Sequence, residues 1–271
     1  MDLFVGVDLA VRIGKRLPVA VLSAHHGVYE VAALKEVAWP RPPSGPGNAV
    51  LVSEDKAARE FAEEAAGYIA EVARHLKGSV RAVAIDAPGS PRSSDRALRA
   101  SEEALCREGL SFFKTPSREE VARFVEIGRA HLTGGGERAR LPHANQIWML
   151  AGFALFEAVE AAHPDAVVLE VYPQATFAAL SAARAHKSSP GGLAAQTKAL
   201  ASQLGMDGTA FSRAVAASCW GSGHDKLDAL SAAWVASLPP EERVALGEVP
   251  HDAIWVPRSS AWRTAEARGV G

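Results

Sequence analysis

Cysteines are few in this sequence, and its histidines lack metal-binding patterns. Its 271 residues include only two cysteines, Cys106 and Cys219, which stand far apart and lack the spacing of metal ligands. Isolated thiols of this kind are typically reduced core residues of a cytosolic protein. The nine histidines show neither an HxH nor an HExxH pattern. These absences argue against a disulfide framework and against a zinc site.

Long apolar runs and a strong net charge are absent as well. No stretch approaches the roughly 20 apolar residues of a membrane span, and the N-terminus lacks the basic and apolar segments of a secretory signal. The formal net charge is −2, so nucleic acid would have to bind at a local patch. We therefore expect a single cytoplasmic domain over residues 1–271, with no membrane partner. The sequence gives no indication of oligomeric state.

The first third of the chain has the pattern of strands followed by a helix and a strand. Three apolar segments with short connections predict an antiparallel meander: 3–10, 17–24 and 27–39. Residues 40–49 are rich in proline and glycine and predict a loop. Residues 54–76 have helical periodicity, with Ser53 as the expected N-cap. The next strand, RAVAIDA at 81–87, should run parallel to the first because a helix connects them.

The remainder of the chain is mostly helical. We expect a helical insertion at about 90–162 on an α/β core, with helix starts at the Ser-rich and acidic segments near 93 and 117. AVVLEVYP at 166–173 predicts a buried strand. Residues 224–238 predict a helix, and residues 252–257 a final short strand.

Carboxylates interrupt the apolar strands in an unusual way. Asp8 in LFVGVDLA and Asp86 in RAVAIDAP lie toward the carboxyl ends of strands that should be parallel neighbours, where α/β sheets bind their ligands. Glu170 lies near the end of a third strand, and Asp225 and Asp228 share one face of a helix. Each acid taken alone has a structural explanation, such as a cap, a turn or an arginine pair. Their convergence from four segments favours a common site.

A site of clustered carboxylates is typical of Mg²⁺ or Mn²⁺, which prefer oxygen ligands. Two such ions can activate water and stabilise the leaving oxygen when a phosphodiester is cleaved. We therefore predict that Asp8, Asp86, Asp225 and Asp228 bind metal. Glu170 is expected either to complete the site or to position the attacking water.

Basic residues near these acids are candidates for phosphate contacts. Arg92 and Arg99, with Arg96 between them, fall on one face of a helix predicted after Asp86. The alternative is a solvated helix face with an Asp95–Arg99 pair. Lys187, in the loop HKSSPGG, is a further candidate for substrate binding.

Aromatic residues of the same region offer a second mode of contact. Phe112, Phe113 and Trp148 have side chains that stack on bases in other proteins. Packing in the core is the simpler interpretation of all three.

The segments GVDLA, AIDAP, EVYP and DKLDA, in this order, resemble the RNase-H-like superfamily. Within it, the chain is most similar to an uncharacterised branch of predicted nucleases, the domain-of-unknown-function family 429. This resemblance covers nearly the whole chain and implies a mixed five-stranded sheet with an antiparallel second strand, flanked by helices. It also implies that Asp8 and Asp86 are the first two acids of the site, with Asp225 and Asp228 as its helical acid pair.

Two positions depart from the pattern of that family. Relatives often have Glu after the Tyr172-Pro173 pair, whereas this chain has Gln174, which cannot be an anionic ligand. His224 and Lys226 flank Asp225 where relatives often have adjacent acids. These departures leave the number of metal ions and the activity of this member open.

The sequence thus favours a metal-dependent nuclease acting on DNA or RNA, with the two substrates undistinguished. One alternative is a non-catalytic binding or scaffold protein with the same fold. Another is an ATP-binding enzyme of the actin-like or sugar-kinase type, which requires a small, glycine-rich turn after the first acid. Asp8 is followed instead by Leu-Ala-Val-Arg. The triple glycine at 134–136 lacks the Lys-Ser/Thr of a phosphate-binding loop.

Overall fold

A five-stranded mixed sheet forms the centre of the protein. The computed structural model describes residues 1–25, 28–35, 40–182, 189–250 and 252–259. The strands lie in the order β3-β2-β1-β4-β5, with bounds β1 (Asp2–Asp8), β2 (Val19–His25), β3 (Val28–Val31), β4 (Ser79–Asp86) and β5 (Val167–Glu170). β2 is antiparallel to β1 and β3, whereas β4 is parallel to β1 and β5. The predicted mixed α/β sheet with an antiparallel second strand is confirmed.

Alternation of side chains along β1 and β4 defines the two faces of the sheet. Val5 and Val7 belong to the core on one face, and Phe4 packs into the core on the other. Side chains alternate with a period of two, so Asp8 falls on the same face as Phe4. Asp86 is the direct register partner of Asp8 and continues the face that carries Ala84. The two acids therefore end neighbouring strands and share a face.

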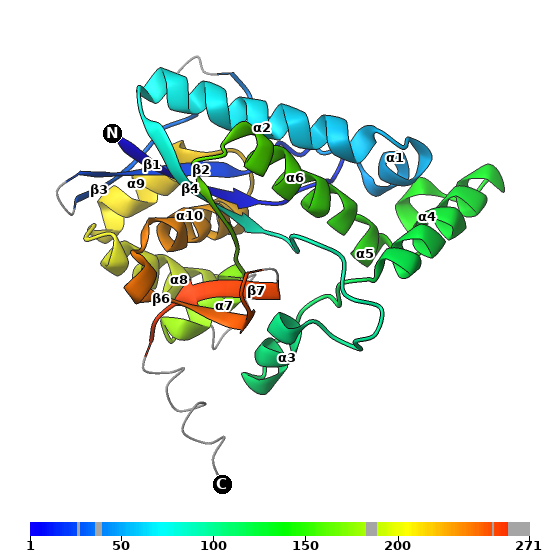
Figure 1. Cartoon of the computed structure of the whole chain (residues 1–271). Coiled ribbons are helices and arrows are strands. Elements are labelled where there is room, and N and C mark those ends of the chain that lie inside the picture. The colour runs from blue at the N-terminus through cyan, green and yellow to red at the C-terminus, as the bar shows by residue number, and fades with distance from the viewer. Residues whose placement is uncertain (26–27, 36–39, 183–188, 251, 260–271) are drawn as a thin grey trace, which may run out of the picture.

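The valine-rich face is covered by α2 (Ala57–Leu76) and α6 (Met149–Ala162), which lie next to each other (Figure 1). The apolar stripe of α2 is the predicted one, with Phe61, Ala65, Ile69 and Val72 buried. The start of the helix differs from the prediction. Ser53 ends a separate helix, α1 (Asn48–Ser53), with its hydroxyl bound to the carbonyl of Ala49, and the N-cap of α2 is Lys56.

The opposite face is covered by α10 (Gly223–Ser237), which contacts β1, β2 and β4. The contact is close because small residues line both sides of it, Ala82 and Ala84 on the sheet and Ala229 and Ala233 on the helix. Three more helices complete this layer: α7 (Pro173–Ala179), α8 (Pro190–Gln203) and α9 (Gly208–Ser218).

The region from 90 to 148 connects β4 to α6. It contains α3 (Ala100–Arg107), α4 (Arg118–Thr133), a 3-10 helix η1 (Arg138–Arg140) and α5 (Ala144–Ile147). Ser117 caps α4 as predicted, through a capping box with Glu120. The prediction of a helix start near 93 is wrong, because residues 91–99 are irregular and α3 begins at Ala100. Of the predicted insertion at 90–162, the last part, α6, belongs to the main core.

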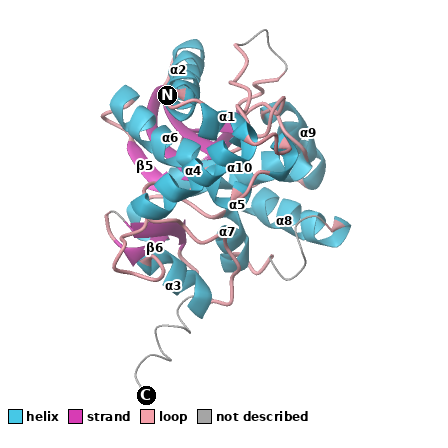
Figure 2. Ribbon diagram, turned by 90° about the vertical axis from the view of Figure 1, so that its right-hand side faces the viewer, coloured by secondary structure: helices cyan, strands magenta, loops and turns pink. Residues whose placement is uncertain are grey.

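A hairpin follows α10 near the C-terminus, and only one of its two strands was predicted from the sequence. After η2 (Pro240–Glu242), β6 (Arg243–Glu248) pairs with β7 (Asp252–Pro257) to form a separate two-stranded sheet. β7 is the predicted final strand, whereas β6 was not predicted. The hairpin lies against α3 (Figure 2). Among the described residues, no helix combines the length and the apolar character that a membrane span requires.

Candidate functional site

Three carboxylates meet at the carboxyl edge of the central sheet. Asp8 from β1, Asp86 from β4 and Asp228 from α10 each place a carboxylate oxygen within 4.8 Å of the others. Asp228 is only 2% exposed, whereas Asp8 and Asp86 are half-buried. Of the five acids predicted from the sequence, the structure brings these three together. We call them the carboxylate cluster.

The packing of α10 against β1 positions the third carboxylate. A Cβ atom at Gly6 would lie 2.0 Å from the carbonyl oxygen of Ala229 and 2.2 Å from the nitrogen of Ala233. Only glycine therefore permits this approach of helix and strand. Asp228 precedes Ala229 on the contacting turn, so the absence of a side chain at Gly6 lets the Asp228 carboxylate reach Asp8 and Asp86.

Asp225 has a different environment one turn earlier on α10. Its carboxylate accepts hydrogen bonds from Lys15 Nζ at 2.8 Å and from the Ser222 hydroxyl and backbone at 2.6 and 2.7 Å. Burial raises the pKa of Asp225, but the hydrogen bonds from Lys15 and Ser222 outweigh it and the pKa lies below its ordinary value. Asp225 lies outside the carboxylate cluster, and its role as a metal ligand stays a prediction.

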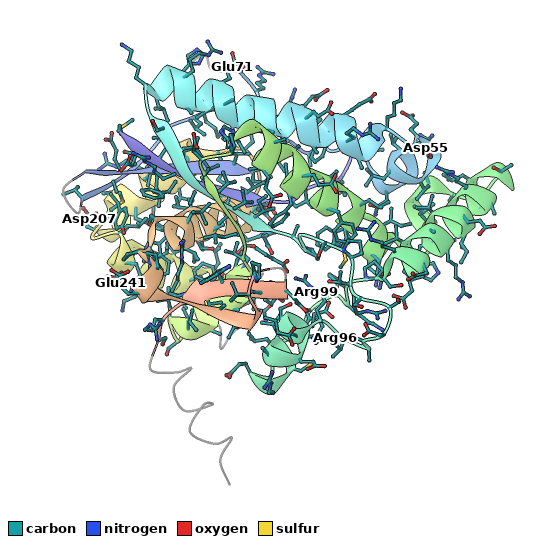
Figure 3. The ribbon with its side chains drawn as sticks, in the orientation of Figure 1. Asp55, Glu71, Arg96, Arg99, Asp207 and Glu241 are labelled. Atoms are coloured by element: carbon teal, nitrogen blue, oxygen red, sulfur yellow. The ribbon has the colours of Figure 1, made fainter. Side chains whose placement is uncertain are left out.

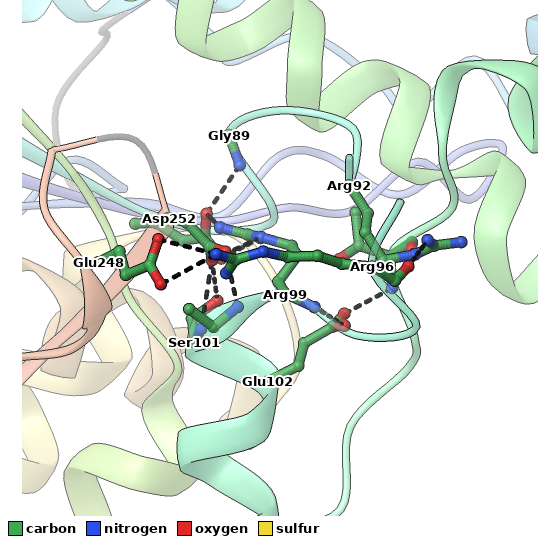
Figure 4. Close-up of polar contacts among 11 residues, drawn as sticks. Gly89, Arg92, Arg96, Arg99, Ser101, Glu102, Glu248 and Asp252 are labelled. Carbon is green, nitrogen blue, oxygen red and sulfur yellow. Dashed lines mark hydrogen bonds and ion pairs between the residues drawn. The ribbon is translucent and has the colours of Figure 1, made fainter. Parts of the chain in front are cut away.

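Glu170 is buried in an ion-pair network formed with Arg99 and Asp252. Figure 4 shows the polar contacts around Arg99 and Asp252. The two oxygens of Glu170 accept hydrogen bonds from Nη1 and Nη2 of Arg99, each at 2.8 Å, and one also accepts from the Gly89 nitrogen at 2.9 Å. Burial raises the pKa of Glu170, and the charge of Arg99 opposes that rise. Because donors from the protein occupy both oxygens, Glu170 holds the chain that follows Asp86 in place.

Asp252 completes this network from β7. It accepts hydrogen bonds from Arg99 Nε at 3.1 Å, from the Ala100 nitrogen at 2.6 Å and from the Ser101 hydroxyl at 2.6 Å. It therefore caps the start of α3 from a distant strand. Asp252 was not predicted from the sequence, because a single acid at the start of a short strand carries no local signal.

The predicted phosphate-binding arginines have protein partners in the structure. Arg99 is 3% exposed and lies between Glu170 and Asp252. Arg92 is also buried and donates to Glu120 at 2.6 Å and to the Thr115 carbonyl. Arg96 and Arg99 lie beside α3 and the hairpin (Figure 3), not on one helix face, because residues 91–99 are irregular. Lys187 lies outside the described residues.

A cleft of about 570 Å³ opens beside the carboxylate cluster. Asp8 and Asp86 line it together with Arg99 and Glu170 from the ion-pair network. The rest of its lining is largely apolar and includes four aromatic side chains: Phe112, Phe113, Trp148 and Tyr172. The cleft thus combines carboxylates at one side with a broad aromatic wall.

The buried thiol near the cluster is not a nucleophile. Burial raises the pKa of Cys219 to about 12, and the negative charges of Asp8 and Asp225 add to that rise. A thiol with such a pKa is protonated at neutral pH and unreactive. Cys106 is exposed, so the expectation of two core cysteines is wrong for this one.

Lys226, the residue beside Asp225 that departs from the family pattern, is 9% exposed and donates to the Ala216 carbonyl at 2.8 Å.

Comparison with known proteins identifies a family without an assigned activity. The model of the family described as protein of unknown function (DUF429) matches residues 43–251, and the chain belongs to this family. The matched range includes Asp86, Glu170 and Asp228, whereas Asp8 precedes it. No curated protein and no solved structure matches the chain.

Proposed function

We propose that this protein is a metal-dependent nuclease that hydrolyses phosphodiester bonds of nucleic acid through a bound Mg²⁺ or Mn²⁺. The observation that carries the proposal is the carboxylate cluster, in which Asp8, Asp86 and Asp228 come from three separate elements to within 4.8 Å. A non-catalytic scaffold predicts acids too far apart to share a metal ion, and the observed separation favours the enzyme.

The donor set of the cluster fits a hard divalent cation. Mg²⁺ binds oxygen ligands at about 2.0–2.1 Å, so two oxygens on opposite sides of one ion are about 4.2 Å apart. The oxygens of the cluster all lie within 4.8 Å of one another, an upper bound that is compatible with this separation. Asp8, Asp86 and Asp228 would therefore hold the metal. A bound Mg²⁺ or Mn²⁺ supplies charge stabilisation at the phosphate and a more acidic coordinated water.

The residues around the cluster have complementary roles in this proposal. Asp8 and Asp86 line the cleft, so the scissile phosphate approaches from their side, while Asp228 supports the site from its buried position on α10. Glu170 is a positioning residue. Through the Gly89 nitrogen it fixes the loop directly after Asp86, and through Arg99 it fixes the start of α3.

The strand order and directions support an RNase-H-like core. The resemblance found in the sequence implies a mixed five-stranded sheet with an antiparallel second strand. The order β3-β2-β1-β4-β5 has this arrangement, with the acids on β1 and β4 as neighbours. The free thiols of Cys106 and Cys219 suit a reducing compartment, and we place the enzyme in the cytoplasm.

Cleavage of nucleic acid by wild type and by Asp8→Asn tests the proposal. End-labelled single-stranded and duplex DNA and RNA are incubated with Mg²⁺, with Mn²⁺ and with a chelator. We expect cleavage that requires metal and that falls at least about 1,000-fold in Asp8→Asn, because about 4 kcal/mol of transition-state stabilisation depends on the site.

Asp2→Asn is the matched control for this experiment. Asp2 lies on the same strand as Asp8 but is exposed and paired with Arg81 at the opposite end. This variant should cleave like wild type. The proposal fails if no substrate is cleaved in the presence of metal, or if Asp8→Asn retains the wild-type rate while both variants are folded by circular dichroism.

A further inference from the structure

Phe113 is exposed in a way that packing does not explain. Its side chain is 59% exposed although it lines the cleft, and none of the core clusters formed by the described residues contains it. Its neighbour Phe112, by contrast, packs against the small core around Leu105 and Ile254. Core packing, the simpler interpretation from the sequence, accounts for Phe112 but not for Phe113.

Aromatic side chains from three separate segments border the same cleft. Phe113 lies in the connection between α3 and α4, Trp148 at the junction of α5 and α6, and Tyr172 directly after β5. The indole nitrogen of Trp148 donates to the Asn145 carbonyl, and the Tyr172 hydroxyl donates to the Ser111 carbonyl at 2.5 Å. These bonds fix the polar ends of two rings and orient their apolar surfaces. A volume of about 570 Å³ is in the range of clefts that bind small molecules.

The charges of the cleft do not suit a phosphate backbone. Among the described residues that line it, Arg99 is the one cation, and its guanidinium is bound by Glu170 and Asp252. Proteins that bind duplexes position them chiefly through Lys and Arg contacts to phosphates. The aromatic cleft offers carboxylates and rings instead.

We infer that the cleft binds an unstacked nucleobase of a single-stranded substrate, with the adjoining phosphodiester at Asp8 and Asp86. This inference rests on the proposed nuclease function and specifies its substrate class. Every base has a face that stacks on an aromatic ring, so such a cleft accepts bases with little regard to sequence. A fully paired duplex has its bases stacked internally and does not present one without distortion.

Binding of mononucleotides isolates this inference from cleavage. Adenosine and deoxyadenosine 5′-monophosphates carry a base and a phosphate but no phosphodiester, so they are not turned over by a nuclease. Calorimetry in the presence of Mn²⁺ compares them with ribose 5-phosphate, which lacks the base. We expect the mononucleotides to bind at least about tenfold more tightly, because stacking adds to the phosphate contact.

Three variants test whether Phe113 causes the tighter binding of mononucleotides. Phe113→Ala should weaken mononucleotide binding roughly 5- to 150-fold, the measured range for loss of one base–aromatic stack. Phe113→Tyr keeps the ring and should bind within about threefold of wild type. Val28→Ala is the matched control, because Val28 is also an exposed apolar residue but lies on β3, at the edge of the central sheet, and should have no effect.

The outcomes separate this inference from the proposed function. Equal or absent binding of mononucleotide and sugar phosphate overturns the inference, as does a Phe113→Ala variant that binds like wild type. Cleavage of blunt duplex as fast as of single strands also overturns it, while leaving the nuclease proposal intact. Base-dependent binding that Phe113→Ala weakens, together with faster cleavage of single strands, supports it. If metal-dependent cleavage fails but this binding persists, the nuclease proposal falls and the base-binding cleft stands.

Discussion

The carboxylate cluster and the ion-pair network both contain acids from the carboxyl edge of the central sheet, Asp8 and Asp86 in the first and Glu170 in the second. In the network, Glu170 and Asp252 receive a guanidinium and several backbone N–H groups, so the protein supplies its own positive charge. In the cluster, Asp8, Asp86 and Asp228 each place a carboxylate oxygen within 4.8 Å of the others. Acids at the ends of parallel strands thus have different roles according to which side chains the neighbouring loops bring to them.

The two groups also differ in what they connect. The network joins the loop after β4, the end of β5, the start of α3 and the hairpin strand β7, all of which border the cleft. The cluster joins the middle of the sheet to α10. We interpret the network as the support of the cleft wall and the cluster as the site of chemistry.

The strongest test of this contrast removes the cation of the network. Arg99→Met leaves Glu170 buried without its partner, and we expect a loss of about 3–5 kcal/mol in the free energy of unfolding, measured by urea denaturation. Without Arg99, burial should raise the pKa of Glu170 further, with the Gly89 N–H remaining as a donor that opposes the rise. A group with a raised pKa in the folded state favours folding at low pH, so the deficit should shrink as the pH falls from 8 to 5.

Arg96→Met is the control for that substitution. Arg96 pairs with Glu248 on the surface, and its replacement should leave stability close to that of wild type. Similar losses in the two variants, or a deficit in Arg99→Met that does not change with pH, would contradict a buried network centred on Arg99.

The second test compares two acids one turn apart on α10. Asp228 belongs to the carboxylate cluster, whereas Asp225 binds Lys15 and Ser222. We expect Asp228→Asn to weaken Mn²⁺ binding about 100-fold or more, because the loss of a ligand should cost at least as much as the roughly 10- to 100-fold lost when a group that supports a ligand is changed. Asp225→Asn should change the affinity only slightly. Calorimetric titration measures both, and equal losses would require Asp225 to be a ligand as well.

The smallest expected effect is on the stability contributed by Asp225. Asp225→Asn weakens the capping box of α10 and the bond to Lys15, and should cost about 1–2 kcal/mol at pH 7. The pKa of Asp225 is below its ordinary value of 3.8, so its contribution is present above that pH and is lost as the pH falls further. Unfolding curves of wild type and variant should therefore converge below about pH 4. A difference that persists at lower pH would show that the carboxylate charge is not its source.

The sequence was sufficient to predict that the two strand acids of the carboxylate cluster lie together. It was not sufficient to predict the ion-pair network. Asp8 and Asp86 interrupt apolar runs whose parallel pairing follows from the helix between them, and the observed register makes them partners. Asp228 was predicted together with Asp225, because spacing along a helix does not tell which of two acids faces the sheet. That choice depends on Gly6, whose role becomes visible only when α10 is in contact with β1.

Arg92 and the start of α3 show why the ion-pair network could not be predicted from the sequence. The segment before Ala100 has the serines and acids of a helix start, yet the Arg92 side chain binds the carbonyls of Ser93 and Arg96 and holds the chain in an irregular path. The helix begins where Asp252, 152 residues from Ala100, caps its first nitrogen. Local sequence cannot specify a cap that comes from so distant a strand.

The direct pairing of Asp8 with Asp86 has a consequence for how this site can be altered or transferred. A slip of one residue between β1 and β4 would turn one strand's side chains to the opposite face, and the two carboxylates would then lie on different sides of the sheet. The geometry of the site thus depends on the strand pairing of the whole sheet, whereas a binding loop can be grafted between scaffolds. Evolution or engineering can reshape the aromatic wall of the cleft piece by piece, but the acids must change together with the core beneath them.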